Sequence, residues 1–169
     1  TNVSRGPIMV LVDESGSMGD AETAAAKGFA LSMAWLAQHQ KRWCCLVGWS
    51  SANQVRELVI EPGTRSGEIM QWCLTKWNGG TSPPVEFIPE LFELTGAPSG
   101  RTDVIWITDG ECNPQGVEVF NKWRAEHAVK VWTIGVGCAA KSFEPFSDVV
   151  TQVRDIHTGQ PVVSELLSL

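Results

Sequence analysis

Short apolar runs alternate with longer amphipathic segments along most of the chain. Four runs hold few polar positions, which is typical of strands in a sheet that is covered on both faces. These predicted strands span 8–12, 43–49, 102–107 and 129–136. A fifth run, 54–60, alternates between apolar and polar residues and so predicts a half-exposed edge strand, and 153–157 predicts one further, weaker strand.

Five amphipathic segments between and after these runs predict helices. They are 20–42, 65–76, a helix that begins at Pro83, 117–127 and a short helix from Val162. In the first of them, Asp20 in the opening turn and Lys41-Arg42 in the closing turn complement the helix dipole. Ser82 is placed to cap the third helix, because serine is favoured at that position and proline directly after it.

Helical spacing also predicts which side chains of the second and third helices are buried. The predicted buried positions are Ile69, Met70, Cys73 and Leu74 in 65–76, and Phe87, Leu91 and Leu94 in the helix after Ser82. Most of the eight tryptophans are expected in the core or half-buried, including Trp35 and Trp123 on helices and Trp106 and Trp132 in strands. Trp49 and Trp77 lie near loop ends, where they could help to form a partner surface.

The alternation of strands and helices predicts the fold class. Such an order favours an α/β architecture with a doubly wound, mostly parallel sheet, one antiparallel edge strand and helices on both faces. The chain of 169 residues is long enough for one domain with a real core. We expect residues 1–169 to be a single domain taken from a longer protein.

Hydroxyl and carboxylate side chains collect where the predicted strands end. Asp13, Ser15 and Ser17 follow the strand 8–12 at alternate positions, and two later loops add Thr81, after Gly79-Gly80, and Asp109. In an open parallel sheet, ligands bind beyond the carboxyl ends of the strands. Sets made only of oxygen ligands suit Mg²⁺, with Mn²⁺ and Ca²⁺ as alternatives, rather than zinc or copper.

Each part of this set has a plainer explanation when it is taken alone. Ser15 and Ser17 could cap the first helix, and Asp109-Gly110 could be an ordinary turn. The glutamates beside the set, Glu14 and Glu111, could tune the electric field of a site or form a solvated rim. The pattern Gly135 to Ala140 fits G-x-G-x-x-A, but Pro145 limits the helix that a dinucleotide site would need.

Composition excludes several classes of partner. The formal charge of −6 and the pI near 5.0 argue against nucleic acid, because binding to its phosphates depends on Lys and Arg. No apolar stretch approaches the ~18–20 residues of a membrane span, so no membrane partner is expected. Five cysteines without regular spacing are most simply reduced thiols, with Cys112 the one that could be exposed near the loops. We therefore expect a cytoplasmic protein.

The loop residues together resemble a known family. Asp13-x-Ser15-x-Ser17, then Gly80-Thr81, then Thr108-Asp109-Gly110, in this order, are similar to the metal-ion-dependent adhesion site (MIDAS) of von Willebrand factor type A (vWA) domains. The resemblance covers essentially the whole chain and fills all five metal-site positions. The segments 6–19 and 42–50 look like those of bacterial intracellular members, the ViaA/CoxE-like proteins that partner MoxR-type AAA+ ATPases and carry this domain at their carboxyl end. Ser82-Pro83-Pro84 departs from the family's pattern.

The resemblance implies a Rossmann-like vWA fold and a role for each residue. Ser15 and Ser17 would bind Mg²⁺ directly, Thr81 directly or through water, and Asp13 and Asp109 through water and the serine hydroxyls. Neutral hydroxyl ligands leave most of the ion's charge uncompensated, so a partner's Asp or Glu is attracted to it. The implied function is a metal-dependent protein-interaction module, with a MoxR-type AAA+ ATPase as the partner class.

Two other functions fit the same architecture. One is a metal-dependent hydrolase or phosphatase, and the other is a structural domain whose metal site is non-functional or only stiffens the loops. Phosphatases that form an aspartyl-phosphate need a second carboxylate two residues after the nucleophile, where this chain has Ser15. The chain also lacks the GxxxxGK[ST] pattern of nucleotide hydrolysis. We expect no enzyme and no catalytic residue.

Overall fold

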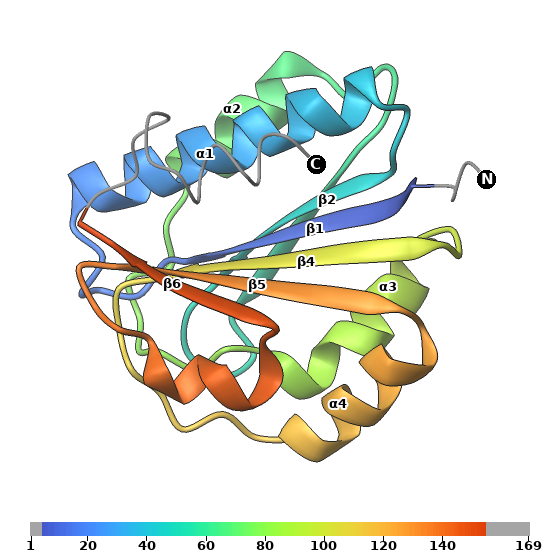
Figure 1. Ribbon diagram of the computed structural model, residues 1–169. Coiled ribbons are helices and arrows are strands. Elements are labelled where there is room, and N and C mark those ends of the chain that lie inside the picture. The colour runs from blue at the N-terminus through green and yellow to red at the C-terminus, as the bar shows by residue number, and fades with distance from the viewer. Residues whose placement is uncertain (1–4, 155–169) are drawn as a thin grey trace.

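A computed structural model describes residues 5–154 and places them in one six-stranded sheet with helices on both faces (Figure 1). The strands are β1 (Arg5–Asp13), β2 (Cys44–Trp49), β3 (Val55–Ile60), β4 (Arg101–Thr108), β5 (Val129–Val136) and β6 (Val149–Val153). Their order is β3-β2-β1-β4-β5-β6, and every pair is parallel except β2 with β3. The predicted fold class, with its antiparallel edge strand, is confirmed.

Two helical layers enclose the sheet. The helices are α1 (Asp20–His39), α2 (Ser66–Leu74), α3 (Ile88–Leu94) and α4 (Val117–Glu126), with short 3-10 turns η1 (Val85–Phe87) and η2 (Lys141–Phe146). α1 and α2 cover one face, and α3 and α4 cover the other (Figure 1). Each face has its own core, because alternate residues of the central strands point to opposite sides. Val10 and Ile105 pack toward α1, whereas Leu11 and Trp106 pack with α3 and α4.

The first helix is shorter than expected, and Arg42, which was predicted in its last turn, has a different role. α1 ends at His39, and Lys41 follows with φ +54°. Arg42 is buried and pairs with Asp103 at 2.7 Å (Nη2 to Oδ2). Its guanidinium also donates to the carbonyl oxygens of Gly6 and Pro7. The expectation that Arg42 serves the helix dipole is therefore wrong, because a buried cation needs an anion and carbonyl oxygens.

The buried side of α2 also differs from the prediction. Trp72 is the buried residue of α2, while Met70 is 61% exposed and Leu74 is 79% exposed. Ile69 and Cys73 are partly buried against the core, as expected. One indole fills the contact that four smaller side chains were predicted to share.

Ser82 does not cap a helix. The segment after it forms η1 from Val85 and then α3 from Ile88, with no side-chain cap on either, and Leu94 is 68% exposed. Leu91 is buried and Phe87 half-buried, as predicted. The two prolines remove backbone donors and delay the helix by one short turn.

The tryptophan and C-terminal predictions are confirmed only in part. Trp106 and Trp132 are buried, but Trp35 is 60% exposed and Trp49 is fully buried, so Trp49 cannot form a partner surface. The last described strand is β6, which ends at Val153 instead of beginning there. The rest of the predicted strand 153–157 and the helix from Val162 lie outside the described residues. Among the described helices, none has the length and apolarity that a membrane crossing requires.

The glycine-rich segment after β5 makes a tight turn. Gly137 has φ +68°, and the short turn η2 follows from Lys141 instead of a long helix. A Cβ on Gly135 would lie 2.3 Å from the carbonyl oxygen of Cys138, so the turn needs glycine there. The segment therefore lacks the helix that a dinucleotide site requires.

Candidate functional site

The candidate site lies where the sheet changes its direction of winding. β1 stands in the middle of the sheet, next to β2 on one side and β4 on the other. Val12 is in register with Gly48 of β2 and Ile107 of β4, so the three strands end at the same edge. The loops after β1 and β4 leave toward opposite faces at this point, which is where open α/β sheets bind ligands.

Ser15, Ser17 and Asp109 form one connected chain of polar contacts. The Oγ atoms of Ser15 and Ser17 lie 3.0 Å apart, and the Ser17 hydroxyl donates to Asp109 Oδ1 at 3.0 Å. Ser15 is buried and Ser17 is exposed, so the group runs from the interior to the surface. The contact between Ser17 and Asp109 joins residues 92 positions apart. Three of the five predicted ligands are thus linked through Ser17, which contacts both of the others.

Asp13 lies directly behind this group. Its Oδ1 accepts the backbone N–H of Ser15 at 2.8 Å, and its Oδ2 accepts the hydroxyl of Thr108 at 2.7 Å. The carboxyl is fully buried, and burial raises its pKa above the ordinary value of 3.8. The hydrogen bonds from Ser15 and Thr108 oppose this rise, and the charge of Asp109 adds to it. A cation next to the hydroxyls would favour the ionised form.

Thr81 lies at the same edge of the sheet, on a loop that contacts the loops after β1 and β4. A Cβ built on Gly110 would lie 3.8 Å from Thr81 Cγ2 and 3.9 Å from Thr81 Oγ1, so Thr81 lies beside the residue that follows Asp109. The loop before Thr81 touches the first loop through the backbone, since Gly16 N–H donates to the Gly79 carbonyl at 2.9 Å. Asp13 ends β1, two serines follow it, Asp109 follows β4, and the Thr81 loop lies against the loops after these two strands.

Two serines that sequence reasoning missed hold the Thr81 loop. The Ser50 hydroxyl donates to the Gly80 carbonyl and accepts the Gly79 N–H, both at 2.9 Å. Ser51 Oγ accepts the Gly80 N–H at 2.6 Å. A Cβ on Gly79 would lie 2.4 Å from Gln54 Oε1 and 2.5 Å from Ser51 Oγ, so this close approach requires glycine. The available signal was that Ser50 and Ser51 also follow a buried strand.

Glu14 is not a rim residue. It is fully buried, and its carboxylate lies 3.1 Å from Lys27 Nζ and 2.9 Å from Arg56 Nη2. The backbone N–H of Trp77 also donates to it at 3.3 Å. A Cβ on Gly48 would lie 1.8 Å from Glu14 Oε2, so the strand beside it has no room for a side chain. Glu14 therefore anchors the Asp13–Ser17 loop to α1 and β3.

Glu111 is a surface residue of the next loop. It is exposed and accepts the backbone N–H groups of Lys141 and Ser142 at 2.9 and 2.8 Å. These hydrogen bonds, those of Ser142 first, lower the pKa of its carboxyl. Of the two predictions for Glu111, the solvated rim is the one that its exposure favours.

The described cysteines are all free thiols, but they are not buried to the same extent. Cys44 and Cys45 are fully buried, and burial raises the pKa of Cys44 to about 12. Cys73, Cys112 and Cys138 are half-buried, and burial raises the pKa of each of them. Cys112 lies 3.5 Å from the Ser142 hydroxyl, and its raised pKa disfavours the reactive thiolate form.

The donor set fits a hard divalent cation. Among residues 5–154, no group of three or more His, Cys, Asp or Glu side chains is placed to hold a metal. A metal at this edge would therefore rely on hydroxyls, and Ser15 and Ser17 present two of them 3.0 Å apart with a carboxylate oxygen adjoining. Oxygen ligands of this kind, completed by water, are what Mg²⁺ accepts.

In sequence, the chain is similar to parts of longer proteins. No family model matches it. It is 25% identical over 161 residues to the uncharacterized protein MJ0811 of Methanocaldococcus jannaschii, across 90% of this chain and 36% of that protein. It is 32% identical over 77 residues to the regulatory protein ViaA of Edwardsiella ictaluri, across 46% of this chain and 16% of that protein. The chain thus spans only a minor part of these relatives.

Solved structures share the fold across nearly the whole chain. Proximal thread matrix protein 1 from the mussel byssus superposes with a TM-score of 0.68 at 14% identity, over 98% of this chain and 46% of that one. BatB from Bacteroides thetaiotaomicron superposes with a TM-score of 0.64 at 15% identity, over 97% and 98%. Pilus adhesin SpaC from Lactobacillus rhamnosus GG gives 0.66 at 12%, over 99% and 30%. At these identities the likeness concerns the fold, and the ViaA stretch is a partial sequence relationship.

Proposed function

We propose that this chain is a vWA-type domain that binds a partner protein through a divalent metal ion, Mg²⁺ first. The observation that carries the proposal is the contact chain Ser15–Ser17–Asp109, which brings two hydroxyls and a carboxylate from two loops to one point. Ser15, Ser17 and Thr81 would hold the ion, with Asp13 and Asp109 as acceptors around it. The ion would supply positive charge and one exchangeable position for a partner's Asp or Glu.

Asp13 suits a supporting role better than a nucleophilic one. Both of its carboxylate oxygens already accept hydrogen bonds, from Ser15 N–H and from the Thr108 hydroxyl. A nucleophilic carboxylate needs an oxygen that the substrate can reach, whereas the Asp13 carboxyl is fully buried. We therefore propose binding without turnover. Steady hydrolysis of a phosphoester in Mg²⁺ that Asp13→Asn abolishes would contradict this.

The partner class that fits the sequence resemblance is a MoxR-type AAA+ ATPase, for which this domain would act as an adaptor. The partial similarity to a regulatory protein, ViaA, supports a regulatory role. The formal charge of −6 does not oppose an acidic partner, because a bound divalent ion is the largest charge nearby.

Titration calorimetry in metal-free buffer tests the metal. Mg²⁺ should bind the wild type, and Ser15→Ala, Ser17→Ala and Asp13→Asn should weaken binding by about tenfold or more. Ser32→Ala is the matched control, because Ser32 is a helical serine of α1 whose hydroxyl donates to the Gly28 carbonyl, outside the candidate site. Equal affinity of Ser17→Ala and Ser32→Ala would overturn the metal assignment.

Binding to a purified MoxR-type ATPase tests the partner. Association should need Mg²⁺, be lost with EDTA and be lost with Asp13→Ala, while circular dichroism shows the fold retained. Association that persists through both changes would refute metal-mediated recognition, and no association in Mg²⁺ would refute this partner class.

A further inference from the structure

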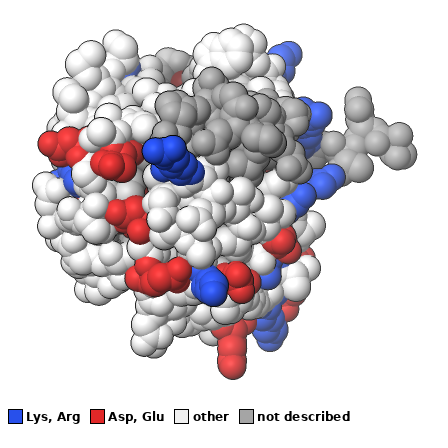
Figure 2. Space-filling model, turned by 60° about the vertical axis from the view of Figure 1, so that its left-hand side comes forward, with Lys and Arg blue, Asp and Glu red and all other residues white. Residues whose placement is uncertain are grey.

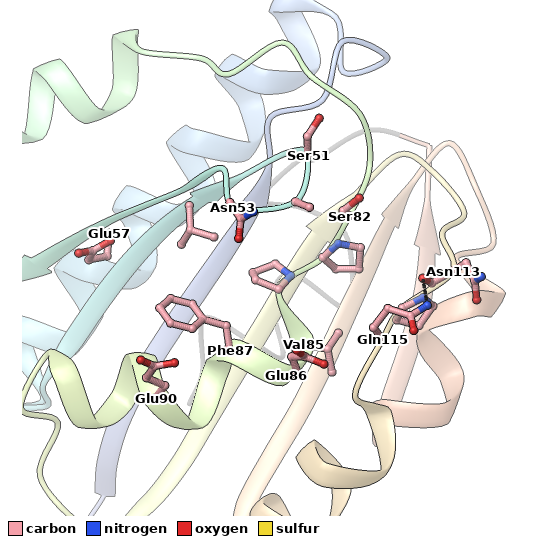
Figure 3. A pocket seen from close by; sticks show the side chains of 15 residues that line it. Ser51, Asn53, Glu57, Ser82, Val85, Glu86, Phe87, Glu90, Asn113 and Gln115 are labelled. Atoms are coloured by element: carbon pink, nitrogen blue, oxygen red, sulfur yellow. Dashed lines mark hydrogen bonds between the residues drawn. The ribbon is translucent and has the colours of Figure 1, made fainter.

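The structure has a cavity of about 630 Å³ (Figure 3). Its walls come from three segments, 51–57, 82–90 and 113–115. The second segment begins one residue after Thr81, and the third begins four residues after Asp109. The cavity and the metal site therefore share two loops. Its volume is in the ordinary range of ligand-binding pockets, about 300–1,000 Å³.

The pocket combines an apolar floor with carboxylates. Pro83 and Val85 are buried, and the half-buried ring of Phe87 faces the cavity (Figure 3). Three glutamates line the same cavity, Glu57 from β3, Glu86 from η1 and Glu90 from α3. Among the residues that the structure describes, no Lys, Arg or His lines it. A pocket of this composition suits a side chain with an aliphatic stem and a positive head.

The carboxylates are available for such a head. Within residues 5–154, none of the three glutamates forms an ion pair, since the pairs join Glu14, Asp103 and Asp148 to other cations. Glu86 packs on Gly116, where a Cβ would lie 2.2 Å from the Glu86 Cβ, and so sits at the amino end of α4. Glu57 and Glu90 stand at the other end of the cavity, on either side of Phe87 (Figure 3).

We propose that this pocket binds a Lys or Arg side chain of the same partner segment whose acidic residue binds at the metal site. The inference rests on the proposed function and deepens it. It specifies a partner segment in which an acidic residue is followed or preceded, a few residues away, by Lys or Arg. The stem would lie on Phe87 and Pro84, and the head would meet Glu57 and Glu90.

Charge complementarity decides the occupant. The side of the molecule that carries the strand ends shows both acidic and basic side chains (Figure 2), whereas the described residues that line the pocket include three glutamates. A uniformly acidic segment would be attracted by the metal ion. It would also be repelled by Glu57, Glu86 and Glu90, since like charges brought together oppose binding. A segment that carries both an acidic and a basic residue is attracted by the metal ion and by the pocket glutamates. The pocket thus gives the metal site a specificity that an ion alone does not have.

Synthetic peptides test this pairing directly. The probes are fluorescein-labelled peptides with one Asp and one Arg, separated by two to six Gly/Ser residues, and matched sets with Asn for Asp or Gln for Arg. Anisotropy is measured in Mg²⁺ and in EDTA, with wild type and with Glu57→Gln/Glu90→Gln. The control is Glu93→Gln/Glu126→Gln, which makes the same charge change on exposed residues of α3 and α4 outside the pocket.

At the best spacing, the Asp–Arg peptide should bind the wild type about fivefold more tightly than the Asp–Gln peptide, as two exposed ion pairs allow. Glu57→Gln/Glu90→Gln should abolish this preference, and the control should keep it. Equal binding of the Arg and Gln peptides, a preference that survives in the pocket variant, or no binding by any peptide would overturn the pocket assignment. Failure of the metal proposal looks different: Asp and Asn peptides would then bind equally, with or without EDTA.

Discussion

The ammonium of Lys27 and the carboxylate of Glu14 lie 3.1 Å apart, and both side chains are almost completely buried. Lys27 also donates to the carbonyl oxygens of Trp72, at 2.7 Å, and Thr75, and its Nζ lies 4.8 Å from the centre of the Trp72 ring. Burial lowers the pKa of Lys27, and the charge of Glu14 opposes this. The pair connects α1 to the loop between Asp13 and Ser15.

Glu14→Gln should destabilise the protein, because it leaves Lys27 and Arg56 without their common anion. Removing one partner of a buried ion pair costs about 3–5 kcal/mol of unfolding free energy. The cost here is lowered because Arg56 is partly solvated. Urea unfolding in EDTA measures the loss. Glu61→Gln, an exposed glutamate at the end of β3, should change stability by less than about 0.5 kcal/mol. Equal midpoints for the two variants would contradict the anchoring role.

Gly48→Ala tests the packing of the Glu14 carboxylate against the neighbouring strand β2. The added Cβ would lie 1.8 Å from Glu14 Oε2, and β2 is buried along its whole length. We expect a loss of more than about 2 kcal/mol, as for overpacking of a close-packed interior. The control is Gly28→Ala on α1, where a Cβ meets nothing within 4 Å and should add about 0.5–1 kcal/mol. Opposite signs for the two variants are the expected result, measured by thermal unfolding.

The pair of Arg42 and Asp103 should matter for stability alone. It lies near the start of β4, since Asp103 is in register with Ile8 of β1, and so stands away from the strand ends that carry the candidate site. Asp103→Asn should cost about 3–5 kcal/mol in urea unfolding and leave Mg²⁺ affinity unchanged. Asp148→Asn, in the more exposed pair with Arg124, should cost less than about 1 kcal/mol. A change in Mg²⁺ affinity with Asp103→Asn would show that the two ends of the sheet are coupled.

Cys44 should make the protein sensitive to alkali. Its thiol has an ordinary pKa of 9.0 when exposed, and burial raises the pKa to about 12 in the folded chain. The unfolded chain therefore loses this proton first, and the free energy of unfolding should fall between pH 9 and 12 by up to about 1.4 kcal/mol per pH unit for this thiol. Below pH 9 the contribution is constant.

Unfolding of the wild type and Cys44→Ala in urea from pH 8 to pH 10.5 isolates this effect. The variant is less stable at pH 8, because a buried side chain is shortened, and the difference between the two proteins should shrink as the pH rises. A difference that stays constant across this range would contradict the assignment to Cys44. Comparing the two proteins also cancels the titration of Lys27, whose lowered pKa acts in the opposite direction.

The strands were predictable because their signal is local. β5 was predicted at the residues where it occurs, 129–136, since an unbroken apolar run needs no information from elsewhere in the chain. The hydroxyls and carboxylates at the strand ends were predictable for a similar reason: once the sheet is parallel, strand ends converge. The meeting of Ser17 with Asp109 follows from that topology.

The buried charges were not predictable in the same way. Glu14, Lys27 and Arg42 look like solvated residues in the sequence, and their burial depends on partners 13 to 61 positions away. No local period records such a pairing. Trp72 shows the same limit for apolar contacts, because a single indole displaced the predicted stripe of α2. The roles of Ser50 and Ser51 required the position of a glycine loop 29 residues later.

The contact between Ser17 and Asp109 has a consequence for synthesis of the protein. A nascent chain that has emerged only as far as α3 already carries Asp13, Ser15, Ser17 and Thr81, yet it lacks β4 and the carboxylate that closes the group. If the proposed binding needs Asp109, a ribosome-bound intermediate would not bind a partner until β4 has inserted beside β1. The order of synthesis would then delay partner binding until the central strands have paired.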